Sequence, residues 1–173
     1  GNNKKFGVQG GLGFVASRLT IEGPIKKDTS SFIISARRTF IDIFLAPPFI
    51  SETSDISGNK YYFYDLNAKV NYRLSDKDRV FISGYFGRDV FKFKSPDSDF
   101  SLSIPWGNAT ATARWNHLFS NKLFLNTSAI YTNYDFQFEG GQEQFSFKLF
   151  SGITDYNLKT DFTWVPSPQH NVK

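Results

Sequence analysis

The sequence predicts an all-β fold, an antiparallel up-and-down sheet of about seven to eight strands that forms a segment of a larger transmembrane β-barrel. Three observations predict this fold. Apolar and polar residues alternate over long stretches, aromatic residues lie at the ends of these stretches, and short and long connections alternate along the chain. The composition agrees, because 20 Phe and 8 Tyr accompany a hydrophobic content of only 40%. No apolar run in the sequence reaches the roughly 20 residues that a membrane helix needs.

The segment 61–89 carries the alternation most clearly. Alternate side chains of a strand point to opposite faces. One face of the first half has tyrosines at both ends and aliphatic residues between them, whereas the other is mostly polar. This order suits a strand that crosses a bilayer, with aromatic residues at the interfaces and aliphatic residues against lipid. A polar turn at 74–78 then makes 61–89 a hairpin. The apolar set is Tyr62, Tyr64, Leu66, Ala68, Val70 and Tyr72.

Two strands are expected before this hairpin. The glycine-rich segment 7–13 is interpreted as a flexible connection, either a linker or the start of a strand, since no phosphate-binding GK[ST] motif follows it. A strand is predicted over 14–22, with Gly23-Pro24 ending it. The next strand is predicted over 31–44. Its alternation fails at Arg37-Arg38, where a β-bulge would restore it.

Three further strands are expected after the hairpin, and an eighth begins near Asn171. Short turns follow the first, third, fifth and seventh strands, and longer loops follow the second, fourth and sixth. This rhythm is typical of outer-membrane barrels, which have short turns at one rim and longer loops at the other. Because the chain contains no Met and ends inside a predicted strand, we interpret it as a piece of a longer protein. The three strands cover 106–116, 123–136 and 149–164, and the loops cover 45–60, 92–105 and 138–148.

Several of these segments resemble the first barrel strands of TonB-dependent outer-membrane receptors of the Bacteroidota type. The most distinctive are FVASRLTIEGPI at 14–25 and SFIISARRTF at 31–40, followed by similar strands at 62–69 and 83–89. The resemblance implies a plug domain inside a barrel of about 22 strands in the cell outer membrane. It makes 1–13 the end of the plug-to-barrel connection and 14–173 a partial barrel.

The resemblance also implies a function and partners. Such receptors import a scarce nutrient, using force that the TonB system transmits through the plug region. Their partners are outer-membrane lipid, the TonB system and the nutrient ligand, and the glycan-importing branch adds a surface lipoprotein. A passive porin or a small structural outer-membrane barrel is the alternative function, and it would lack a plug and a TonB box. A soluble β-sandwich or lipocalin-like binder is a third possibility, against which the order of the aromatic residues argues.

Ten polar residues of the predicted strands are expected to face the barrel lumen. A charged residue facing lipid near the bilayer midplane is unfavourable by about 2–4 kcal/mol for Arg or Lys. These side chains either bond one another and a plug, which we favour for any single residue, or line a substrate path. The set is Arg18, Glu22, Asp65, Asn67, Lys69, Arg73, Arg114, Asp155, Lys159 and Asp161.

No residue is a candidate for catalysis, cofactor binding or metal binding. His117 and His170, the 2 histidines, lie far apart and lack partners at metal-ligand spacing. The chain has no cysteine, which excludes thiol chemistry. Lys and Arg are dispersed among acidic residues, so no basic stripe predicts nucleic-acid binding. We therefore expect a protein that is not an enzyme and uses no cofactor.

Overall fold

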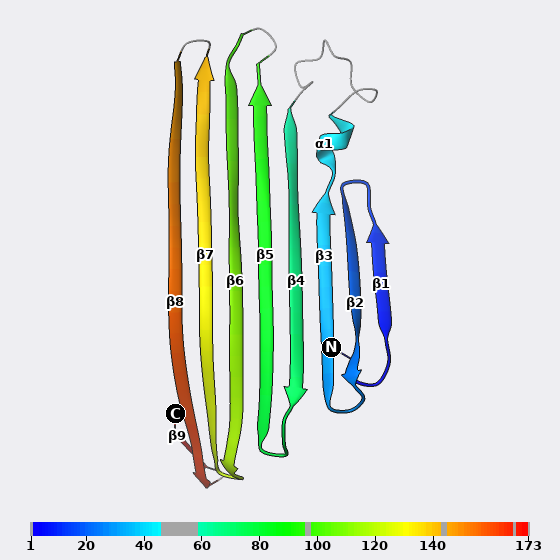
Figure 1. Cartoon of the computed structure of the whole chain (residues 1–173), viewed down its shortest axis with the longest axis vertical. Coiled ribbons are helices and arrows are strands. Elements are labelled where there is room, and N and C mark those ends of the chain that lie inside the picture. The colour runs from blue at the N-terminus through cyan, green and yellow to red at the C-terminus, as the bar shows by residue number, and fades with distance from the viewer. Residues whose placement is uncertain (1, 46–58, 96–97, 143–144, 168, 173) are drawn as a thin grey trace.

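The computed structural model describes residues 2–45, 59–95, 98–142, 145–167 and 169–172. These residues form one antiparallel sheet of 9 strands, and each strand pairs with its neighbours in the sequence (Figure 1). The two edges of the sheet do not pair with each other, so the sheet is open. The all-β, antiparallel, up-and-down architecture is therefore confirmed, and the open sheet is compatible with a segment of a β-barrel.

The strands become longer from β3 to β8, whereas the edge strands β1 and β9 are short (Figure 1). A short helix, α1 (Ile41–Phe44), follows the third strand. The turns after β2, β4 and β6 lie at one end of the sheet, here named the turn end. Helix α1 and the starts of β4, β6 and β8 lie at the opposite end, here named the loop end. The strands are β1 (Gly7–Leu12), β2 (Ala16–Lys26), β3 (Ser30–Thr39), β4 (Lys60–Arg73), β5 (Asp78–Lys94), β6 (Ser101–Ser120), β7 (Leu123–Gln142), β8 (Phe145–Ser167) and β9 (His170–Val172).

The register of the strands joins the separately predicted apolar sets into one surface. Residues that pair across neighbouring strands point to the same face of a sheet. Val70 pairs with Ile82, which pairs with Ala113, and this row continues to Ala129 and Leu158. We name this surface the apolar face and the opposite surface the polar face.

The apolar face has no protein layer over it. Among the described residues, only Val90 and Leu125 are buried hydrophobic residues, with 6% and 8% of their surface exposed, whereas Ile82 is 56% and Leu158 77% exposed. The chain exposes 12009 Å² in total. A compact soluble monomer of 19.7 kDa would expose about 8600 Å². The sheet therefore lacks the sandwiched core that a soluble domain of this size builds.

Of the two alternatives for the glycine-rich segment, the start of a strand is confirmed, because the backbone of β1 pairs with that of β2 although this strand carries few side chains. One expectation near the N-terminus is wrong. Gly23-Pro24 does not end β2, which continues to Lys26 with a register shift after Pro24. The pairing of β1 stops at Glu22, so Pro24 lies where β2 has one neighbour, and a missing N–H is tolerated at such a position.

The bulge predicted at Arg37-Arg38 is also absent. The pairing of β2 with β3 runs without a shift from Thr39 to Ser31, and the segment 41–44 is helical rather than extended. Arg38 therefore stays on the apolar face. Its guanidinium lies 3.3 Å from the carboxylate of Asp42 and 5.6 Å from the centre of the Tyr62 ring, which accommodates the charge at the loop end.

Two of the three loops are shorter than predicted. β5 continues to Lys94 and β6 begins at Ser101, while β7 reaches Gln142 and β8 begins at Phe145. Alternating residues continue through these segments, and Pro105 is accommodated because the β6–β7 pairing skips it. Most of the first predicted loop, 45–60, lies outside the described residues. The alternation of short and long connections is wrong after β7, whereas the connection 95–100 after β5 is still longer than the turns after β4 and β6.

Gly107 supplies a test of the tight strand packing. A Cβ atom at Gly107 would lie 2.7 Å from the carbonyl oxygen of Gly87, whereas a Cβ at Gly84 would lie 3.6 Å from its nearest neighbour. We expect Gly107→Ala to lower the free energy of unfolding by about 1–3 kcal/mol. The matched change Gly84→Ala should alter it by less than about 0.5 kcal/mol. Urea titrations followed by tryptophan fluorescence measure both; equal effects would contradict this packing.

Candidate functional site: the polar face and the turn end

The ten residues predicted to face a lumen all lie on the polar face. Their positions follow from the rows of paired residues. Arg18 pairs with Arg37, which pairs with Asp65, and Arg114 is joined through Ser128 to Lys159. The remaining predicted residues share this face by the same alternation. They are Glu22, Asn67, Lys69, Arg73, Asp155 and Asp161.

An ion pair near the loop end joins β3 to β4 on the polar face. The Nη2 atom of Arg37 lies 2.7 Å from Asp65 Oδ2, and the Arg37 guanidinium lies 4.8 Å from the centre of the Phe63 ring. Asn67 Nδ2 donates to Asp65 Oδ1 over 3.5 Å. Arg37 was not among the predicted residues because the register of 31–44 was open. Continuing the alternation from Ser31 would have placed Arg37 on the polar face, but not opposite Asp65.

Hydrogen bonds also join neighbouring strands elsewhere on this face. Asn71 Nδ2 donates to Ser31 Oγ over 2.7 Å, and Arg114 Nε donates to Ser128 Oγ over 3.2 Å. Of the predicted residues, two pairs are brought into contact: Asp65 with Asn67, and Lys159 with Asp161 at 3.4 Å. The polar face is therefore a wall of distributed donors and acceptors with charges of both signs.

Charged residues mark the limits of the apolar face along β5. Asp78 stands at the turn end and Arg88 towards the loop end, and both belong to the apolar face by register. The residues of this face between them are Val80, Ile82, Gly84 and Phe86. The stretch 79–87 between these two charged residues matches the about 9–11 residues that a tilted strand needs to cross a bilayer. We name the uncharged zone between these two levels the apolar band.

An ion pair neutralises the charges at the limit of the apolar band that lies towards the loop end. Arg88 Nη1 lies 3.1 Å from Asp135 Oδ2, and the two residues flank Gly107 in one row of paired residues. Tyr64 and Phe86 lie at this level with their ring centres 6.0 Å apart. An aromatic and charged boundary thus closes the band towards the loop end.

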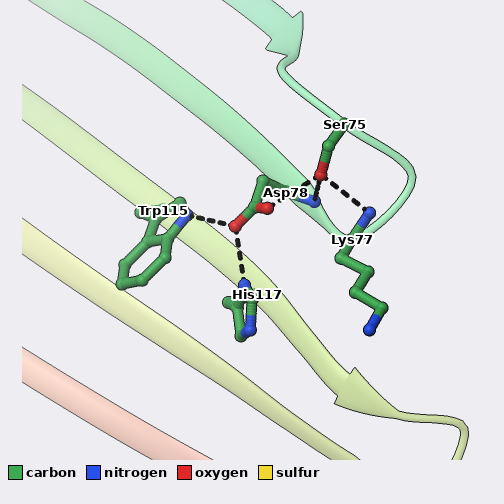
Figure 2. Close-up of polar contacts among 5 residues, drawn as sticks. All are labelled: Ser75, Lys77, Asp78, Trp115 and His117. Carbon is green, nitrogen blue, oxygen red and sulfur yellow. Dashed lines mark hydrogen bonds and ion pairs between the residues drawn. The ribbon is translucent and has the colours of Figure 1, made fainter.

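A polar cluster closes the band at the turn end (Figure 2). Asp78 Oδ1 accepts a hydrogen bond from Trp115 Nε1 over 3.0 Å and lies 2.6 Å from His117 Nδ1. Ser75 Oγ donates to Asp78 Oδ2 over 2.8 Å and accepts the backbone N–H groups of Lys77 and Asp78. The cluster ties the β4–β5 turn to β6. These hydrogen bonds, that with His117 foremost, hold the pKa of the Asp78 carboxyl below its ordinary value of 3.8.

Neither histidine has a neighbouring set of metal ligands. His117 contacts Asp78, and the Nδ1 atom of His170 lies 2.8 Å from Ser167 Oγ. Within the described ranges, no group of three or more His, Asp or Glu side chains could hold a metal ion. In the same part of the chain, no helix has the length and hydropathy of a membrane span.

Comparison with protein-family models, curated proteins and solved structures gave no match for this chain.

The Asp78 cluster predicts a pH-dependent stability. A carboxyl group with a lowered pKa in the folded protein stabilises it above the ordinary pKa, and this contribution disappears as the pH falls through the lowered value. We expect wild type to exceed Asp78→Asn in stability at pH 5–7, with the difference shrinking below about pH 4. Urea midpoints measured across this pH range test the expectation.

Asp76→Asn is the matched control, because Asp76 lies in the same turn with 91% of its side chain exposed, and its exposed ion pair with Arg73 should contribute little to stability. Its midpoint should stay close to that of wild type. A difference between wild type and Asp78→Asn that does not change with pH would contradict the role of the ionised carboxylate.

Proposed function

We propose that this chain is the barrel portion of a TonB-dependent outer-membrane transporter that imports a scarce nutrient. The observation that carries the proposal is the apolar face, which is continuous across the sheet, bounded by charged residues and exposed. Burying apolar surface contributes about 25 cal/mol per Å², so an uncovered face of this extent is unfavourable in water. Lipid covers such a face in a membrane.

The backbone pairing supports a barrel wall. In hydrocarbon every backbone N–H and C=O needs an internal partner, which β-sheets supply only when their edges are paired. The edge of β8 is long, yet β8 pairs with β9 only near its turn end. A long unpaired edge of this kind is satisfied when further strands continue the sheet into a closed barrel.

The polar face supports a transport role. In a closed barrel it would surround the interior, where its distributed donors, acceptors and charges could contact a plug or a passing polar solute. The EGPI segment of β2 and the SARRTF segment at 35–40, which resemble those of TonB-dependent receptors, favour a plugged transporter over a passive porin. In this proposal the partners are outer-membrane lipid, the nutrient, the TonB system acting through a plug, and a surface lipoprotein in the glycan-importing case. The role involves no catalysis.

Two measurements on the native protein test this function without knowledge of the nutrient. The protein that carries this sequence would be isolated from the outer-membrane fraction of its source. Its intact mass would be measured, and it would be reconstituted into planar bilayers. A plugged transporter predicts a mass several times the 19.7 kDa of this chain and no steady ionic conductance. Ohmic conductance would establish a porin instead. Absence from the membrane fraction would contradict both functions.

A further inference from the structure

A group of lysines lies on the apolar face beyond the apolar band. Lys60 on β4 pairs directly with Lys92 on β5, and Lys94 follows two residues later on the same face. Their register with Arg88 places all three on the apolar face, at the loop end. The face that is apolar between Asp78 and Arg88 is thus strongly basic beyond Arg88, towards the loop end.

This arrangement is unfavourable unless an anion is present. The Cβ atoms of directly opposite residues lie about 4.5–5.5 Å apart, and like charges at such positions destabilise a sheet. None of the three lysines forms an ion pair with another residue in the part of the chain that the structure describes. Glu139 lies in the same row of paired residues as Lys60 and Lys92, but its Oε1 atom lies 4.0 Å from Lys148 Nζ instead.

The lysines line a concave site with further hydrogen-bonding groups. The pocket has a volume of about 590 Å³, and its lining includes all three lysines together with Ser101 and Ser103. Asp99 and Glu139 also line the pocket, but the three lysines outnumber these two carboxylates, so the lining carries a net positive charge. Ammonium and hydroxyl donors around a positive concavity are the chemistry that binds phosphate oxygens.

The height of the pocket fits the surface of a bilayer. Lys92 lies four residues beyond Arg88, which is about 14 Å along a strand and about 10 Å of height once the strand is tilted. The headgroup layer is about 5–8 Å deep on each side of the hydrocarbon, and long lysine side chains bend towards it. The ammonium groups of Lys60, Lys92 and Lys94 can therefore reach lipid phosphates.

From this geometry we infer that the lysine pocket is a binding site for phosphate groups, supplied by the headgroup of an anionic lipid in the leaflet at the loop end. The inference rests on the proposed membrane location of the apolar face. The lipid offsets the repulsion between Lys60 and Lys92 and fixes the loop end of the sheet at the membrane surface.

The test uses the protein isolated from its membrane in detergent. Native mass spectrometry would measure binding of phosphatidic acid, which carries a phosphate monoester, and of phosphatidylcholine, whose phosphate is neutralised by choline. The triple change Lys60→Gln, Lys92→Gln and Lys94→Gln should weaken phosphatidic acid binding at least tenfold. A matched triple change at the turn end, Lys4→Gln, Lys5→Gln and Lys27→Gln, should leave it unchanged.

Three outcomes would overturn the inference: equal losses in both triple variants, no preference for phosphatidic acid in wild type, or equally tight binding of inorganic phosphate in calorimetry. Urea midpoints without anionic lipid provide an independent readout, since removal of the repulsion between Lys60 and Lys92 should maintain or raise stability. A lower midpoint for the loop-end variant would assign the lysines a structural role instead. A protein found in the outer membrane that shows no lipid preference would overturn this inference alone, whereas a protein absent from the membrane would overturn the proposed function as well.

Discussion

The unshifted antiparallel register from β3 to β8 within the apolar band is the constraint on which the two-faced sheet depends. A slip of one residue in any pairing would move the apolar residues of a strand to the polar face. The register shifts in the described strands lie after Pro24, after Leu118 and after Trp164, all near the turn end. The band itself is thus assembled from uninterrupted pairing, and this pairing places Ile82, Ala113 and Leu158 on one surface.

The two ends of the apolar band hold their charged groups by different contacts. At the turn end, Asp78 is held by hydrogen bonds from β6 and from its own turn, which fixes a charged group beside Trp115 and His117. At the loop end, Asp135 neutralises Arg88. The lysine group of β4 and β5 lies on the same face beyond these two residues. In the proposed membrane location, an aliphatic middle between two polar limits would give the sheet a preferred depth in lipid, in the same way that interfacial residues anchor membrane strands.

Side-chain alternation made much of this architecture predictable. The β4–β5 hairpin, the strands that became β6 to β8 and the common face of the ten polar residues all follow from a period of two. Strand β1 stayed one of two alternatives because its three glycines carry no side chains from which a period can be read. The strand extensions to Lys94 and Gln142 were missed because charges, glycines and Pro105 resemble loop composition, although cross-strand pairing extends through them.

Contacts between distant residues were less predictable than strands. The contact of His117 with Asp78 depends on which residues of β5 and β6 stand opposite each other, and alternation does not fix that offset. The ion pair of Arg37 with Asp65 was hidden for the same reason, since the conflict at Arg38 obscured the register of β3. That conflict has a local cause: Asp42 of α1 pairs with Arg38, so a charge on the apolar face is tolerated at the loop end.

The claim that the apolar face contacts lipid can be measured directly on β6. The chain contains no native cysteine, so single cysteines at positions 108–116 can each carry a spin label in the protein reconstituted in lipid vesicles. Accessibility to oxygen, which partitions into lipid, and to a water-soluble nickel complex would then be compared. The account predicts a period of two, with higher oxygen accessibility at odd positions such as 109, 111 and 113. Uniform accessibility, or oxygen accessibility that peaks at even positions, would contradict it.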